Sequence, residues 1–151
     1  SDDARLDIQA HGFWTRGEEA FFDVRVFCPD APSYGSRSLS SLYTMHERRK
    51  CNEYESRVIN VERGSFTPLV FSVNGGCSRL CSTFLKRLCH MQADTSGTCY
   101  SLVIGLLRCR LSFALLRSAI LCMRGARSRY HHPRRCVRDV PLVIAEAGVA
   151  C

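Results

Sequence analysis

Residues 20–28, Ala-Phe-Phe-Asp-Val-Arg-Val-Phe-Cys, restrict the fold more than any other part of the chain. Aromatic and β-branched residues dominate this stretch, and both favour a β-strand. Successive side chains of a strand point to opposite faces, so Asp23 and Arg25 share one face and the apolar residues between them share the other. The chain therefore has to build a sheet around a strand that carries two charges on one face.

A second strand is predicted just before the first. Residues 4–9, Ala-Arg-Leu-Asp-Ile-Gln, alternate between apolar and polar, which is typical of a half-buried strand. The link between the two strands holds two glycines and a charge cluster, as turns do. We expect an antiparallel hairpin in which Asp7 comes close to Asp23, with their carboxylates within about 4–7 Å of each other.

The rest of the chain alternates between helix and strand patterns. A charged helical pattern covers about residues 40–61, and Gly64 ends it. Residues 66–73 predict a third strand, which Pro68 places near an edge or a strand start. Two helices follow, at about 78–92 and 99–124. The candidates for buried positions in the first helix are Leu42, Met45, Tyr54, Val58 and Ile59.

This order predicts an α/β domain with a three-stranded or larger mixed sheet flanked by helices, ending in two packing helices. We place the domain at residues 1–128, with room for an opening element upstream of residue 1, and an irregular tail at 129–151. The last helix is apolar enough to raise the question of a membrane span. Arginines inside it, at 108, 110 and 117, would each cost a few kcal/mol in a bilayer, which favours a buried packing helix and no membrane.

The net charge of +7 is unevenly distributed. Residues 77–138 carry 12 Lys and Arg against one acidic residue, whereas residues 1–76 carry 9 against 11. Clustered cations release counterions from phosphates, so a polyanionic partner is plausible for the second half. Arg110, Arg117 and Arg124 recur every seven residues on one helix face; we interpret them as DNA contacts or as a solvated face.

Ten cysteines raise the possibility of disulfides or of zinc. Nothing at the start of the chain has the pattern of a secretory signal, so free thiols that pack as small hydrophobes are the favoured interpretation. Cys77, Cys81, Cys89 and His90 suggest a zinc site only weakly, because Cys89 and His90 are adjacent on one helix and point in different directions.

Paired carboxylates carry the clearest chemistry. Two such groups brought together repel each other unless a cation lies between them, and hard divalent ions prefer oxygen ligands. Asp7 and Asp23 are therefore candidate ligands of Mg²⁺ or Mn²⁺, and an ion there would activate water and offset phosphate charge.

Asp7, followed by Asp23-Val24-Arg25 on the next strand, then a helix and a strand, resembles the PD-(D/E)xK nuclease superfamily. More narrowly, residues 3–128 resemble the restriction-like endonuclease that follows reverse transcriptase in site-specific non-LTR retrotransposons. That family pairs an Arg/Lys-Pro-Asp strand with a later acid and a Lys-x-x-x-Tyr helix. This chain has Arg5-Leu6-Asp7, then Asp23, then Lys50 and Tyr54.

The chain departs from the pattern at two positions. Leu6 replaces the proline, and Arg25 replaces the lysine of the superfamily motif. Arginine stays protonated, so Arg25 can clamp phosphate or orient water but cannot act as a general base. Lys50 is one of only two lysines, and we expect it to supply the missing ammonium from the same side of the sheet as Asp23.

The resemblance implies a metal-dependent DNA endonuclease that nicks target DNA in the nucleus for an adjoining reverse transcriptase. Asp7 and Asp23 would hold the metal; Arg25, Lys50 and Tyr54 would complete the site; Arg5 and Arg16 would contact DNA. The alternative is a catalytically inactive nucleic-acid-binding remnant of the same fold. A small structural or interaction domain would leave the charge asymmetry unexplained.

Plain structural interpretations of the same residues remain open as well. Asp23 and Arg25 could form an ion pair on a solvated face, Asp7 could be a lone exposed acid, and Lys50 and Tyr54 could be ordinary helix-surface neighbours. Trp14, near the hairpin tip, either stacks on a base or covers the core.

Overall fold

The structure, a computed structural model, describes residues 6–125 of the chain. Its sheet has three strands, β1 (Ile8–His11), β2 (Glu19–Phe27) and β3 (Ser65–Ser72), in the order β1-β2-β3. β1 runs antiparallel to β2, and β3 runs parallel to it. The expected α/β class, the antiparallel hairpin, the mixed sheet and the edge position of Pro68 are confirmed.

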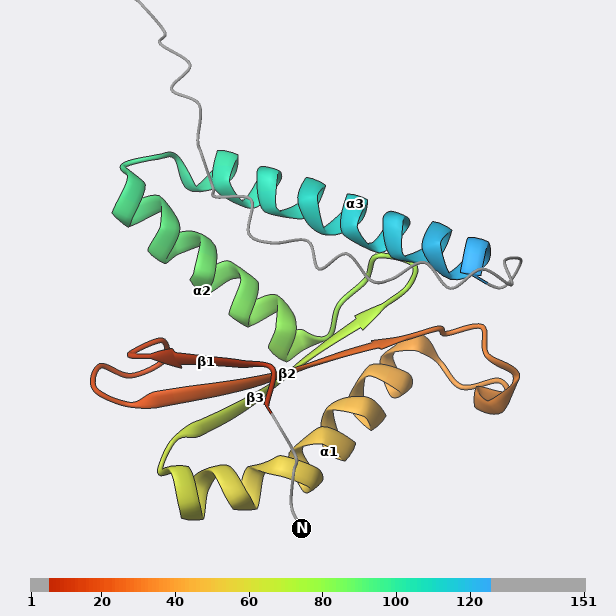
Figure 1. The fold of residues 1–151 in the computed structure, drawn as a ribbon, viewed down its shortest axis with the longest axis horizontal. Helices are drawn as coiled ribbons and strands as arrows, with labels where there is room; N and C mark the ends of the chain where they lie inside the picture. The colour runs from red at the N-terminus through yellow and green to blue at the C-terminus, as the bar shows by residue number, and fades with distance from the viewer. Residues whose placement is uncertain (1–5, 126–151) are drawn as a thin grey trace, which may run out of the picture.

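The helices cover both faces of this sheet (Figure 1). A 3₁₀ turn, Pro32–Tyr34, leads into α1 (Leu39–Arg57), which lies on one face and continues into a π-helical turn, Val58–Glu62. The two later helices, α2 (Arg79–Ser96) and α3 (Tyr100–Gly125), lie on the opposite side, with α2 against the sheet. The result is a layered arrangement of helix, sheet and helix.

The core is divided between the two faces of the sheet. On the α2 side, Phe22 packs in an aromatic cluster with Phe13 and Phe84. On the α1 side, Phe27 packs with Leu42 and Val70. Successive side chains of β2 thus point to different layers, and the strand is buried except at Val24, Arg25 and Val26, which are exposed, and at its partly exposed first residue.

Local sequence signals set the limits of the helices. The hydroxyl of Ser38 accepts a hydrogen bond from the amide of Ser41 at the start of α1, and Ser78 does the same for Cys81 at the start of α2. Gly97 ends α2 in the left-handed conformation. Both helices therefore begin where a serine side chain accepts from a free amide, and α2 ends at a glycine.

The first strand is shorter and later than expected. The predicted strand at residues 4–9 is wrong in its start, because β1 begins at Ile8 and Asp7 lies just before it. The amide of Gly12 donates to the carbonyl of Glu18 and closes the hairpin directly after His11. At the other end, the side chain of Asp7 occupies the next amide of β2, so the backbone ladder stops.

The prediction of a buried final helix is also wrong. α3 packs on α2, but several of its large apolar side chains are exposed, Phe113 at 67% and Leu102 at 55% among them. The apolar residues of α3 lie on more than one side, and α2 covers only one of them. Cys109 is exposed for the same reason, so the idea that it packs as a small hydrophobe fails. Ile59, expected to be buried, is 54% exposed.

Trp14 covers the core, as one of its two interpretations predicted. Its indole nitrogen donates to the hydroxyl of Thr67, and its ring packs on Phe13 and Phe22. Arg87 of α2 donates to the carbonyl oxygens of Phe13 and Trp14 and fixes this corner of the hairpin. The cysteines among residues 6–125 whose side chains are described are free thiols. Within that range, no helix has the length and apolarity that crossing a membrane requires.

Candidate active site

A buried ion pair joins the sheet to α1. Asp23 is only 5% exposed, and its Oδ2 atom lies 2.9 Å from Nζ of Lys50. The expected position of Lys50, on the same side of the sheet as Asp23, is confirmed. The interpretation of Asp23 as part of a solvated pair with Arg25 is wrong, since Asp23 is buried and its ionic partner is on α1.

Residues four apart on α1 form one inward stripe. His46, Lys50 and Tyr54 follow one another at this spacing, which places side chains on the same helix face. Nζ of Lys50 lies 4.9 Å from the ring centroid of Tyr54, and the Tyr54 ring lies 5.6 Å from that of Phe66. Tyr54 is buried, so Lys50 and Tyr54 are not surface neighbours. The ring of Tyr54 contacts the ammonium of Lys50 from within α1, and the carboxylate of Asp23 contacts it from β2.

The charge state of Lys50 follows from its surroundings. Burial alone lowers the pKa of its ammonium, but the hydrogen bond and charge of Asp23, with help from Tyr54 and Glu53, outweigh burial and raise the pKa above 10.5. Lys50 is therefore a cation at neutral pH. In this arrangement it provides positive charge and cannot accept a proton from water.

Asp7 reaches the same strand from the hairpin. Its Oδ2 atom accepts a hydrogen bond of 2.8 Å from the amide of Val24, the residue directly after Asp23. Because Ile8 pairs with Phe22, the preceding residue Asp7 is level with Asp23 across the two strands. Asp7 is exposed at the end of the strand pair. It is thus anchored beside Asp23, and the separation of the two carboxylates stays a prediction.

Arg25 is exposed on the face that α1 covers, two residues beyond Asp23. Burial lowers the pKa of the neighbouring His46, and the charges of Arg25 and Arg49 lower it further. His46 is buried against the ring of Phe27, and its Nε2 lies 3.1 Å from the hydroxyl of Tyr34. Arg25 itself is exposed, so its guanidinium is open to solvent.

Two polar residues near this site were not singled out from the sequence. His46 could have been found from its spacing of four residues from Lys50, which in turn lies four before Tyr54. Glu53, whose Oε2 lies 3.7 Å from Nζ of Lys50, sits one helical turn along from that lysine. These spacings point to His46 and Glu53 only once Lys50 is known to be largely buried.

The donor set decides what metal would fit here. Carboxylate oxygens are the ligands that Mg²⁺ prefers, and this ion is commonly held by one or two carboxylates plus water and substrate phosphates. One oxygen of each candidate ligand is already engaged, Asp7 Oδ2 by the Val24 amide and Asp23 Oδ2 by Lys50. Across residues 6–125, no three His, Cys, Asp or Glu side chains are grouped to hold an ion. A divalent ion held here would therefore have to take most of its ligands from water and phosphate.

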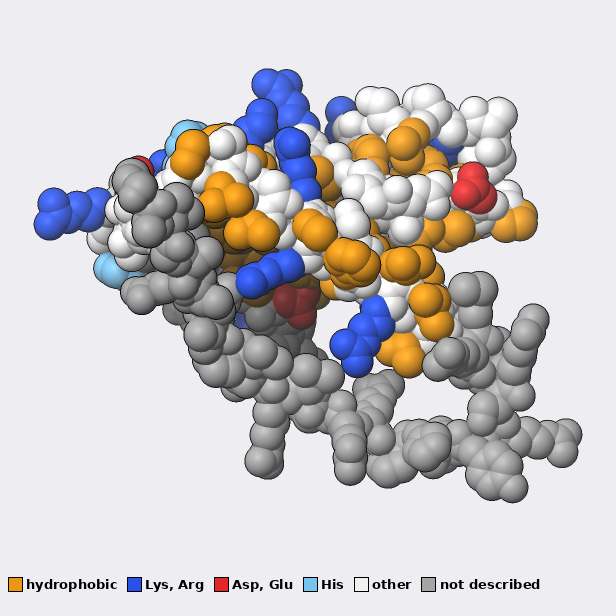
Figure 2. Space-filling view, turned by 90° about the horizontal axis from the view of Figure 1, so that it is seen from above, with side chains coloured by type: hydrophobic (Ala, Val, Ile, Leu, Met, Phe, Trp, Pro, Cys, Tyr) orange, Lys and Arg blue, Asp and Glu red, His pale blue; other side chains and the backbone are white. Residues whose placement is uncertain are grey.

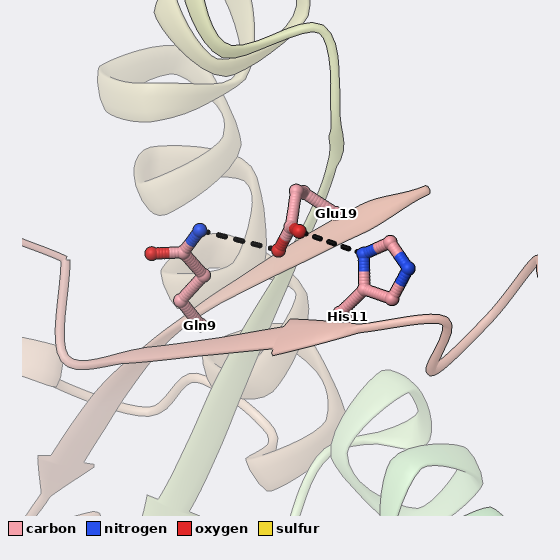
Figure 3. A network of polar contacts seen from close by, with 3 residues as sticks. All are labelled: Gln9, His11 and Glu19. Atoms are coloured by element: carbon pink, nitrogen blue, oxygen red, sulfur yellow. Dashed lines mark hydrogen bonds and ion pairs between the residues drawn. The ribbon is translucent and has the colours of Figure 1, made fainter. Parts of the chain in front are cut away.

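A second polar network lies at the other end of the hairpin. Glu19 of β2 accepts a hydrogen bond from Gln9 at 3.1 Å and pairs with Nδ1 of His11 at 2.8 Å (Figure 3). These hydrogen bonds, that of His11 above all, lower the pKa of Glu19. His11 and Glu19 are direct partners across the strands. The network links β1 to β2 at the hairpin end remote from Asp7.

The candidate DNA-contacting arginines are spread over the molecule. Arg16 is exposed in the turn between β1 and β2. Arg110 and Arg117 are exposed on α3, which lies on the opposite side of the sheet from Lys50 (Figure 1). Arg5, the side chain of Arg124 and the tail at 129–151 lie outside the described residues. The contribution of these arginines to DNA binding stays a prediction.

No protein family, curated protein or solved structure matches this chain. The fold therefore stands on the sheet order and the packing of the three helices. Any function has to be argued from Asp7, Asp23, Lys50 and their neighbours.

Proposed function

We propose that the domain is a metal-dependent DNA endonuclease with a restriction-endonuclease-like fold. One observation carries the proposal: Lys50, from a helix, is in ionic contact with Asp23 of the central strand, and Asp7 is anchored beside it. The resemblance implies two acids and a lysine from a helix in one site, and the contact of Lys50 with Asp23 supports the part that concerns the lysine. The proposal gains support because α1 delivers Lys50 and Tyr54 together.

Each residue has a role set by its surroundings. Asp7 and Asp23 would hold Mg²⁺ or Mn²⁺, which when bound supplies Lewis-acid activation of the scissile phosphate and of water. Lys50, held cationic by Asp23, offsets negative charge on the phosphate. Arg25, exposed on the same face, offers a guanidinium to a phosphate oxygen. Tyr54 keeps the ammonium of Lys50 in place.

The biological setting is part of the same proposal. In a non-LTR retrotransposon, the nick would be made in nuclear DNA and would prime the reverse transcriptase of the same polyprotein. This step comes from the resemblance alone. The chemistry of the site does not depend on it, so cleavage can be tested with any supercoiled plasmid.

The decisive experiment measures conversion of supercoiled plasmid to nicked circles with and without Mg²⁺ or Mn²⁺. We expect nicking only with metal, and Asp7→Asn should reduce its rate by roughly a hundredfold or more while leaving the fold intact. Asp7 is exposed, which makes it a cleaner test than the buried Asp23. Asp94→Asn, a change at an exposed acid of α2, is the matched control and should nick at the parental rate.

A second candidate is a catalytically inactive remnant that still binds nucleic acid. The absence of a three-residue ligand group within residues 6–125 and the arginine at position 25 favour it. The remnant would retard plasmid or duplex DNA in a gel without nicking at any metal concentration. Metal-dependent nicking that Asp7→Asn abolishes would exclude it.

A further inference from the structure

α3 carries apolar side chains on two separate sides. One side faces α2, where Ile104, Leu107, Leu111 and Leu115 help to line a cavity of about 270 Å³. The other side faces solvent. A helix that is apolar on a second, uncovered side has more apolar surface than its own domain uses.

The exposed side has a regular spacing, which alternates between four and three residues. We call it the α3 seam; its members are Leu102, Leu106, Cys109, Phe113, Leu116 and Ile120. This alternation is the pattern of positions a and d in a coiled coil. A hollow of about 360 Å³ lies over its second half, lined by Phe113, Leu116, Arg117, Ile120 and Leu121. The seam therefore has the geometry that receives a second helix.

Arginines flank the seam along one edge. Arg110 and Arg117 each follow a seam residue directly and repeat with the same period of seven, which is the e position of the heptad. Both are exposed, and α3 contains no Asp or Glu between Tyr100 and Gly125. Figure 2, seen from the α2 and α3 side, shows Lys and Arg side chains lying among apolar ones on this face. The edge of the seam is thus positively charged.

We propose that the α3 seam binds an amphipathic helix of another protein, with apolar residues at its own a and d positions and Glu or Asp beside them. The apolar seam would receive the partner's a and d side chains. Arg110 and Arg117 would pair with the acidic residues at its edge, because charges at positions e and g select coiled-coil partners. The seam is an interaction surface distinct from the Asp23–Lys50 site, which lies on the other side of the sheet.

A second copy of α3 fits the seam less well. In a parallel pair of α3 helices, Arg110 and Arg117 at e would face the small residues Gly105 and Ser112 at g. In an antiparallel pair they would face each other and repel. Neither arrangement gives Arg110 or Arg117 a carboxylate. Charge complementarity therefore selects an acidic helix over a copy of this chain.

The test uses the full chain and a synthetic probe. The probe is a fluorescent four-heptad peptide with Leu at a and d and Glu at e and g, which repels itself and stays monomeric. A second peptide has Lys in place of every Glu. Anisotropy titrations should show binding of the Glu peptide and at least about tenfold weaker binding of the Lys peptide.

Three variants separate the contributions. Phe113→Asp should weaken binding of the Glu peptide by about a hundredfold, because the change puts a charge in the middle of the seam. The double variant Arg110→Glu/Arg117→Glu should reverse the preference and favour the Lys peptide. Arg48→Glu/Arg49→Glu, on exposed positions of α1, is the charge-matched control and should leave both affinities unchanged.

The outcomes that overturn the proposal are distinct. Failure of the Glu peptide to bind, or binding that Phe113→Asp does not affect, would show that the seam is not a helix-binding surface. A chain that is dimeric by light scattering and becomes monomeric with Phe113→Asp would assign the seam to a second copy. If duplex DNA displaced the peptide, and the arginine variant but not Phe113→Asp weakened DNA binding, the arginines would belong to a nucleic-acid surface.

Discussion

Nζ of Lys50 lies 2.9 Å from Oδ2 of Asp23, with both side chains largely buried between α1 and β2. Removing one partner of such a pair leaves an uncompensated charge, whereas replacing both with apolar residues restores packing. We expect Lys50→Ala to lower the free energy of unfolding by about 3 kcal/mol, and Lys50→Met/Asp23→Leu to recover most of this. Urea unfolding followed by circular dichroism measures both. Equal stability of Lys50→Ala and the parent would show that the pair is solvated.

The same ion pair predicts a loss of stability in alkali. The pKa of Lys50 is raised above 10.5 in the folded chain, so its contribution is complete below that value and is lost as the pH rises through the folded pKa. Burial also raises the pKa of Tyr54, which acts in the same direction, so the measurement belongs in a Tyr54→Phe background. The free energy of unfolding, measured with urea as the pH rises, should fall more steeply in the chain that has the Lys50–Asp23 pair than in Lys50→Met/Asp23→Leu. Parallel curves would contradict the assignment.

His46 predicts a loss of stability in acid. Burial, with the charges of Arg25 and Arg49, lowers the pKa of this histidine below 6.5, so the folded chain resists its protonation. Stability is unaffected above the ordinary pKa and falls as the pH drops below it, until the lowered pKa is passed. Between about pH 7.5 and about pH 5, His46→Gln should flatten the fall in unfolding free energy. His90→Gln, a change at an exposed histidine, serves as control and should keep the parental slope.

Gly64 joins the π-helical turn to β3 at a point with no room for a side chain. A Cβ atom there would lie 2.5 Å from the carbonyl oxygen of Glu19 and 2.8 Å from Cε2 of Phe21. We expect Gly64→Ala to destabilise the domain by about 2 kcal/mol. Gly105→Ala adds its methyl group to open space on α3 and should instead stabilise by up to about 1 kcal/mol. Thermal unfolding compares the stability of the two variants. Equal changes in stability would mean that the junction at Gly64 shifts to make room for the methyl group.

The proposed cleavage predicts what happens when Arg25 is replaced by the lysine found in the superfamily that the chain resembles. Arg25→Lys keeps a positive charge on the exposed part of the face that holds Asp23, so nicking should be retained or raised. Arg25→Glu should reduce nicking by at least about tenfold, because it repels phosphate. Arg79→Glu, at an exposed position of α2, controls for the change in net charge. Loss of nicking in Arg25→Lys, with folding intact, would show that the guanidinium itself is required.

The sequence predicted the helices and strands better than it predicted which of their side chains are buried. The alternation around Asp23 was enough to place β2 and to assign its two faces, because strand periodicity is local. The exposure of Phe113 was not predictable, since whether an apolar helix side is covered depends on which helix packs against it. The start of β1 was likewise missed, because the side chain of Asp7, not a backbone group, accepts from the amide of Val24; the expected level of Asp7 with Asp23 does follow from the observed pairing.

In the candidate site, too, one residue could be found from the sequence and another only from the fold. Lys50 was singled out because it is one of only two lysines and because Lys50 and Tyr54 match the Lys-x-x-x-Tyr pattern of the family that the chain resembles. His46 was missed, although it lies on the same stripe of α1. Its burial follows from the approach of Phe27 and Tyr34, which only the tertiary fold brings about.

The hairpin is tied at both ends by side chains, Asp7 to the amide of Val24 and Glu19 to His11. A slip of one residue between β1 and β2 would break both ties at once. If β2 turned over with such a slip, Asp23 would enter the aromatic cluster of Phe13 and Phe84, and Phe22 would meet the ammonium of Lys50. These two polar contacts form only in the alignment that keeps charge and aromatic rings in separate layers, so they stabilise that register over its neighbours.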